Sequence, residues 1–257
     1  MTEWLRAFVS EPMSFLQQAF FRMVAVLIGL CCHEWGHAYV AWRCGDDTAK
    51  KAGRMTLNPF AHLDPFGTLL MLFAGFGYAK PVPVNPNRFR GNRLRADLCV
   101  SLAGITVNTI LFILFTYLSV LFSFILWDKK VIDYYGIATL VSYRYNAVWA
   151  VISGNAQELF GELIASRWAL PVVRICAYTA LVNLNLAVFN LIPIPPLDGY
   201  HVVNDLLFKG RIHLDPMVFR IAMLMVLILS AQGIFGRIIS AVVYPAQGFL
   251  LLPFGGT

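Results

Sequence analysis

Residues 96–127 read ADLCVSLAGITVNTILFILFTYLSVLFSFILW, and Asp97 is the only charged residue in this stretch. A transmembrane helix needs about 20 consecutive apolar residues, so this stretch is long enough to cross a bilayer. Further apolar stretches cover residues 21–42, 170–191 and 217–254. Apolar residues make up 58% of the chain and charged residues 13%, against roughly 45–50% and 25% in soluble domains. The sequence therefore predicts an integral membrane protein.

The apolar stretches predict an all-α polytopic membrane protein with about five or six hydrophobic segments, built as a single domain over residues 1–257. Residues 1–20 mix aromatic and charged side chains, which is typical of an interfacial N-terminal helix. Residues 21–208 are expected to form the core that carries the functional residues. Residues 209–257 are expected to form the C-terminal membrane segments.

Residues 56–95 lie between the first two full spans and differ from them in composition. A short apolar stretch is followed by Gly75-Phe76-Gly77-Tyr78-Ala79-Lys80-Pro81-Val82-Pro83-Val84-Asn85-Pro86. Glycine and proline favour turns and extended backbone. Non-helical backbone at membrane depth persists only where protein buries it or where it lines a wet cavity. We therefore expect a re-entrant, extended or β-like element that lines a site.

The net charge of +6 comes from basic loops between the apolar stretches, at residues 43–54, 80–95 and 209–220. Loops rich in lysine and arginine remain cytoplasmic, so these connections predict a multi-pass protein of the cell membrane with these loops inside. The lipid bilayer explains the basic residues better than nucleic acid, which is excluded as a partner. The sequence leaves the oligomeric state open.

The first apolar stretch contains His33-Glu34-Trp35-Gly36-His37, an H-E-x-x-H sequence. Histidines four residues apart share one helix face, so both imidazoles can reach one metal ion with Glu34 beside them. Imidazole suits zinc, and a catalytic zinc site takes a third protein ligand and leaves a position for water. The pattern predicts one Zn²⁺ per chain and Glu34 as the catalytic acid and base.

The third ligand has to come from another segment. Asp198 follows the proline-rich Ile192-Pro193-Ile194-Pro195-Pro196 and precedes Gly199, at the same predicted membrane depth as the histidines. Glu158 and Glu162 are the alternative, because some membrane zinc proteases take a glutamate, but they lie in the region expected outside the cell. A transporter or metal-permeation protein is the non-enzymatic alternative, since it also uses charged residues and broken spans within the membrane.

Two further stretches complete a resemblance to a known family. Residues 190–199, Asn-Leu-Ile-Pro-Ile-Pro-Pro-Leu-Asp-Gly, and the Gly75–Pro86 stretch together with H-E-x-x-H resemble the site-2 protease family of intramembrane metalloproteases, in its short bacterial form. The resemblance implies zinc-dependent cleavage of transmembrane segments of single-span membrane proteins. It also implies that Asn190 lies near the active site and contacts substrate. Asn108 has the position of a family asparagine and is a second candidate for contact with substrate, although Ile105 replaces the family's proline.

Such a substrate is helical, and its carbonyl groups are held in internal hydrogen bonds. The substrate must therefore unwind locally before hydrolysis. The extended residues Tyr78, Val82 and Val84 are candidates for a strand edge that pairs with the unwound chain. A plain hydrophobic loop is the equally weighted alternative for this segment.

Overall fold

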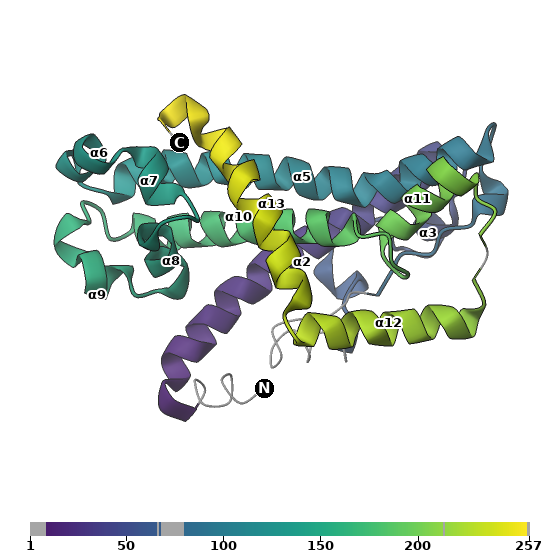
Figure 1. The fold of residues 1–257 in the computed structure, drawn as a ribbon, viewed down its shortest axis with the longest axis horizontal. Coiled ribbons are helices and arrows are strands. Elements are labelled where there is room, and N and C mark those ends of the chain that lie inside the picture. Colours follow the sequence, from purple (N-terminus) through teal and green to yellow (C-terminus); the bar gives the residue numbers. More distant parts are fainter. Residues whose placement is uncertain (1–8, 66, 68–79, 213, 256–257) are drawn as a thin grey trace. The chain divides into compact units, whose positions relative to one another are not determined.

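The computed structural model describes residues 9–65, 67, 80–212 and 214–255, and these residues are mainly helical (Figure 1). They form no β-strand, and their one β-type contact is an isolated antiparallel bridge between Trp127 and Ile164. Tyr78 and most of the predicted re-entrant element lie outside the described residues. The longer helices of the described chain are α2 (Pro12–Arg43), α5 (Arg93–Leu126), α10 (Ala169–Asn190), α11 (Asp198–Phe208), α12 (Pro216–Ala231) and α13 (Ile234–Leu251).

Within the described residues, four helical stretches are long and apolar enough to cross a membrane: α2, α5, α10 and Ile234–Phe254. The α12 helix is apolar but shorter. The first three agree within a few residues with the spans expected at 21–42, 96–127 and 170–191, except at the start of α2. The expected boundary at residue 20 is wrong in this structure, because residues 12–20 continue into the first span as one helix. No glycine or proline interrupts residues 13–28, so nothing in the sequence ends a helix there.

The chain divides into two compact units, and the first comprises Met1–Val26, Ile110–Leu184 and Ser240–Thr257. Figure 1 shows its short helices grouped beside the ends of α5 and α10 that they connect. A buried apolar cluster that includes Val120, Leu126, Val151 and Val173 packs these elements together. The short elements of this unit are α6 (Lys129–Tyr135), α7 (Ile137–Val141), α8 (Asn146–Ser153), α9 (Ala156–Phe160), η3 (Gly161–Leu163) and η4 (Leu252–Phe254).

The second unit comprises Leu27–Thr109 and Asn185–Ile239 and contains both H-E-x-x-H and Asp198. Its short elements are α3 (Thr48–Lys51), η1 (Pro59–Ala61) and η2 (Pro86–Arg88). The α2 helix ends at Arg43 because Gly45 has a positive φ of 107°, a conformation that favours glycine. The α10 helix ends at Asn190, since the prolines that follow cannot donate backbone hydrogen bonds.

Candidate metal centre

His33 and His37 lie one turn apart on α2, and both side chains are buried. Their Nε2 atoms are 2.9 Å apart, and their rings meet edge to face. Two imidazole nitrogens that face one point from neighbouring turns are suited to bind one cation together. The helical spacing of the pentapeptide is therefore enough to build this half of the centre.

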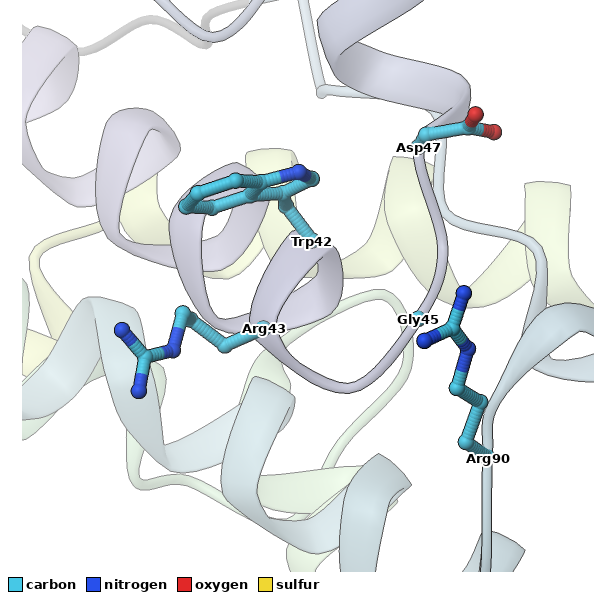
Figure 2. Close-up of a pocket in the computed structure, with 5 residues that line it drawn as sticks. All are labelled: Trp42, Arg43, Gly45, Asp47 and Arg90. Carbon is cyan, nitrogen blue, oxygen red and sulfur yellow. The ribbon is translucent and has the colours of Figure 1, made fainter.

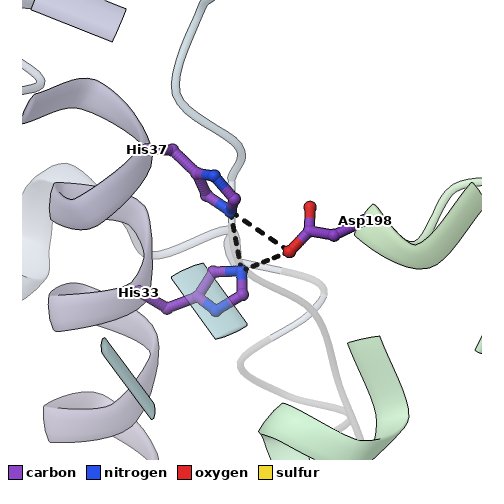
Figure 3. A group of neighbouring side chains, drawn as sticks. All are labelled: His33, His37 and Asp198. Atoms are coloured by element: carbon purple, nitrogen blue, oxygen red, sulfur yellow. Dashed lines mark hydrogen bonds and ion pairs between the residues drawn. The ribbon is translucent and has the colours of Figure 1, made fainter. Parts of the chain in front are cut away.

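Asp198 completes the cluster, as Figure 3 shows. Its Oδ2 atom lies 3.3 Å from Nε2 of His33 and 3.3 Å from Nε2 of His37. The ligand atoms of the three residues all lie within 4.8 Å of one another. Oδ2 is buried, and no group in the described part of the chain donates a hydrogen bond to it. Two imidazoles and one carboxylate that converge in this way fit a tetrahedral zinc ion with one position left for water.

Gly199 fixes the position of Asp198 at the start of α11. A Cβ atom on Gly199 would lie 2.3 Å from the carbonyl oxygen of Leu191 and 2.7 Å from that of Ile192. The chain that leaves α10 therefore packs directly against the backbone beside Asp198, and only glycine permits this approach. This packing fixes the position of the Asp198 carboxylate relative to the end of the third span.

Gly104 on α5 lies against the two imidazoles, and its missing side chain leaves room for both rings. A Cβ atom there would lie 2.5 Å from Cε1 of His33 and 2.5 Å from Nε2 of His37. Gly36 on α2 serves the same approach from the other side, because its Cβ would lie 2.9 Å from Val107 Cγ2. The two glycines allow α2 and α5 to pack closely at the level of the cluster.

The second nitrogen of each histidine contacts α5. Nδ1 of His37 lies 2.7 Å from the carbonyl oxygen of Val100, so Nδ1 carries the proton and Nε2 keeps its lone pair for a metal. Nδ1 of His33 lies 3.2 Å from the side-chain nitrogen of Asn108, whose side-chain oxygen is buried and has no partner among the residues that the structure describes. If the amide of Asn108 is rotated by 180°, its oxygen accepts a hydrogen bond from Nδ1–H of His33. Both the amide oxygen and the imidazole N–H then have a partner. This contact favours orientation of His33 as the role of Asn108, rather than contact with substrate.

Glu34 is buried beside the histidines, and its Oε2 atom accepts a 2.7 Å hydrogen bond from the backbone N–H of Val82. Val82 packs with Ala38 and Ala49 in a small apolar cluster, against which Val84 lies partly buried. The extended segment at residues 80–85 therefore contacts the acidic residue directly. Sequence reasoning placed this segment near the site but missed the bond to Glu34.

Asp46 anchors the same segment from the turn after α2. Its side chain is buried, and Oδ2 accepts a 2.7 Å hydrogen bond from the backbone N–H of Asn85. Oδ1 accepts bonds from both the backbone N–H and the hydroxyl of Thr48. The guanidinium group of Arg54 donates a 2.7 Å hydrogen bond to the carbonyl oxygen of Lys80, at the start of the segment. The Asp-x-Thr spacing signals a local turn, but its link to Asn85 has no sequence signal.

Three other described candidates, Asn190, Glu158 and Glu162, do not join the cluster. Asn190 donates its amide to the carbonyl oxygen of Leu186 one turn earlier on α10. Glu158 and Glu162 are exposed in the first unit. The carboxylate shared by the two imidazoles belongs to Asp198, so the geometry favours Asp198 over either glutamate.

A family model described as peptidase family M50 matches residues 21–231. The chain belongs to peptidase family M50. YwhC of Bacillus subtilis is 38% identical over 203 residues, which cover 79% of this chain and 75% of YwhC. Rip2 of Mycolicibacterium smegmatis is 25% identical over 218 residues, and Rip2 of Mycobacterium tuberculosis is 28% identical over 201 residues. The names of all three relatives assign them provisionally to the zinc metalloproteases.

The aligned part covers 83% and 77% of this M50 peptidase but only 64% and 61% of the two mycobacterial relatives. No solved structure matches the chain at a comparable level of significance. The family, the relatives and the apolar helices together make the protein an intramembrane zinc metalloprotease. The transporter alternative is thereby set aside.

Proposed function

We propose that His33, His37 and Asp198 hold the zinc ion and that Glu34 is the catalytic acid and base. The observation that carries this assignment is the position of Asp198 Oδ2, 3.3 Å from both imidazole Nε2 atoms. The reaction is hydrolysis of peptide bonds within or near transmembrane segments of single-span membrane proteins.

Zinc held by these residues would supply a Lewis acid for the hydrolysis of a peptide bond. Glu34 would accept a proton from the attacking water and deliver it to the leaving nitrogen. The Val82 N–H holds Oε2 of Glu34, which leaves Oε1 for the proton transfer.

The hydrogen bonds within the extended segment determine where a substrate could pair with it, because they leave few backbone N–H groups free. Residues 81, 83 and 86 are prolines and have no N–H. The N–H of Val82 is bonded to Glu34 and that of Asn85 to Asp46. Among the described residues, Val84 is left with a backbone N–H that has no partner. An unwound substrate would therefore pair at Val84, close to the catalytic carboxylate.

The proposal extends to the role of Asn190 and to the side of the membrane that the active site faces. The oxygen of the Asn190 side chain has no protein donor among the described residues and is suited to accept a bond from a substrate N–H. The basic loops favour an active site toward the cytoplasmic side of the membrane. Reporter fusions that fluoresce only in the cytoplasm, placed after Lys51 and after Lys130, test this orientation. A cytoplasmic signal from the Lys130 fusion alone would reverse it.

The metal set is tested on the full chain, purified in detergent, by zinc analysis and by cleavage of a single-span substrate peptide. Glu34→Gln should retain zinc and lose cleavage. Asp198→Asn should lose most of the zinc, whereas Glu162→Gln, the matched control, should retain both zinc and activity. Loss of zinc only in Glu162→Gln would overturn the assignment of Asp198.

The pairing at Val84 is tested with Val84→Pro, which removes the free N–H, and with Val84→Ala, which keeps it. Val84→Pro should raise KM about tenfold, since a lost hydrogen bond costs about 1–1.5 kcal/mol. Zinc content should stay normal in both variants. Equal KM values for the proline and alanine variants would rule out pairing at this position.

A further inference from the structure

A pocket lies at the end of α2, lined by Trp42, Arg43, Gly45, Asp47 and Arg90. Figure 2 shows Trp42 beside the turn, with the Arg43 and Arg90 side chains on its opposite sides. Trp42 and Arg43 are the last two residues of the first span helix. Tryptophan and arginine at the end of a span lie at the level of the lipid headgroups. The pocket therefore opens at the depth where a bilayer presents its phosphate groups.

The pocket carries positive charge that the protein does not neutralise. Asp47 is its one acidic residue and already pairs with Lys51 at 2.6 Å and with Arg88 at 2.7 Å. The bond from Lys51, together with Arg88, holds the pKa of Asp47 below its ordinary value. Within the described part of the chain, Arg43 and Arg90 have no acidic partner. The Lys50 ammonium lies 4.4 Å from the centre of the Trp42 ring and adds a third cation.

The position of Arg90 is built into the fold. Its backbone N–H donates a 2.8 Å hydrogen bond to the carbonyl oxygen of Cys44. Gly45 leaves the room that the side chain occupies, because a Cβ atom there would lie 2.7 Å from Arg90 Cγ. The stem of Arg90 is therefore fixed across the turn, while the residue as a whole stays exposed.

We propose that this pocket binds the headgroup phosphate of an anionic phospholipid. Arginine presents several N–H donors in a planar fork that matches phosphate oxygens. Basic pockets beside membrane helices attract anionic headgroups. The membrane is the source of phosphate at this depth, so a lipid is favoured over a soluble anion.

A lipid bound in this pocket would affect the active site indirectly, through contacts within the second unit. A headgroup bound at Arg90 would hold the segment that follows residue 85 against the turn after α2, where the Arg90 N–H already contacts Cys44. The same turn is joined to the chain at Asn85 by the Asp46 carboxylate, and Val82, three residues before Asn85, donates its N–H to Glu34. Anionic lipid should therefore raise turnover by keeping Glu34 in place.

The experiment measures lipid retention and activity separately, so that it does not depend on the proposed catalytic roles. The full chain is purified from a mixture of phosphatidylcholine and phosphatidylglycerol, and the retained lipids are identified by native mass spectrometry. Activity is measured in phosphatidylcholine vesicles with and without about 30 mol% phosphatidylglycerol, a strongly anionic surface. The test variant is Arg43→Gln with Arg90→Gln, and the matched control is Arg144→Gln with Arg167→Gln, two exposed arginines of the first unit.

Wild type and the control should retain phosphatidylglycerol and be stimulated by it. The test variant should lose about fivefold in retention for each arginine removed, and its activity without anionic lipid should stay unchanged. Replacing both arginines with lysine should give an intermediate result, since charge remains but the fork is lost. Equal retention by wild type and the test variant would overturn the proposal. Stimulation in lipid-free micelles by millimolar inorganic phosphate or glycerol 3-phosphate would also overturn it, because a soluble anion would then be the ligand.

Discussion

The backbone N–H of Val82 donates a 2.7 Å hydrogen bond to Oε2 of Glu34, across 48 residues of sequence. Val82→Pro removes this donor, whereas Val82→Ala keeps it. A hydrogen bond to a charged group contributes about 1.5–3 kcal/mol, so kcat should fall roughly 10- to 100-fold in the proline variant. Zinc content and KM should change little. An unchanged kcat in Val82→Pro would show that the bond does not position Glu34.

Gly104→Ala should disturb the metal centre without disturbing the helix. Alanine favours helix over glycine, but its Cβ would lie 2.5 Å from both imidazoles. We expect zinc affinity to fall at least about tenfold, the effect typical of displaced ligand geometry. Gly248→Ala on α13 is the matched control, because nothing lies within 4 Å of its Cβ position. Normal zinc binding in Gly104→Ala would mean that α5 can move away from α2 at no cost.

Asp46→Asn should weaken the support of the extended segment. Both carboxylate oxygens accept backbone N–H bonds, and an asparagine would point its NH₂ group at one of these donors. A buried group left unsatisfied costs about 1–3 kcal/mol, so the thermal unfolding midpoint and kcat should both fall. Asp47→Asn is the control, because Asp47 lies beside Asp46 but is only partly buried, and its ion pairs with Lys51 and Arg88 near the surface should contribute little to either quantity. Equal effects of the two variants would contradict the role of Asp46.

The metal-binding residues have local sequence signals, whereas the hydrogen bonds that support them do not. The helix spacing of His33 and His37 is local, so it predicted two neighbouring ligands directly. Asp198 was predicted from a proline-broken span and an Asp-Gly turn, and the structure brings it to the histidines. The bonds from Val82 to Glu34 and from Asn85 to Asp46 join a backbone group to a distant side chain. No periodicity or spacing signals such a bond, because it depends only on how the segments pack.

The start of the first span and the role of Asn108 were predicted in part, and the structure changes their details. The first span was expected from residue 21, but α2 starts at Pro12, because an interfacial amphipathic pattern and the start of a span have similar composition at a helix end. Asn108 was expected near substrate, but its side chain is fully buried against His33. A polar residue on an apolar span indicates proximity to a site. It does not indicate whether the side chain faces a ligand or orients one.

The stability of the protein should depend on Asp205, a buried carboxyl group on α11. Burial, and secondly the nearby Asp97 carboxylate, raise the pKa of Asp205 from 3.8 to about 6. The folded chain therefore holds this proton to higher pH than the unfolded chain, and stability falls as pH rises from about 4 to 6. Asp205→Asn should raise the unfolding midpoint at pH 7, and this gain should shrink as the pH approaches 4. Asp133→Asn, at an exposed site, is the control, and a gain independent of pH would contradict the explanation.

The packing of Leu191 and Ile192 against Gly199 also bears on biosynthesis. The histidines are made and inserted long before the aspartate, whose position depends on the end of the third span. We expect the nascent enzyme to remain inert until that span has entered the membrane, so newly inserted neighbours are not exposed to a half-built protease. A chain truncated after Asn190 should accordingly insert into the membrane but fail to take up zinc.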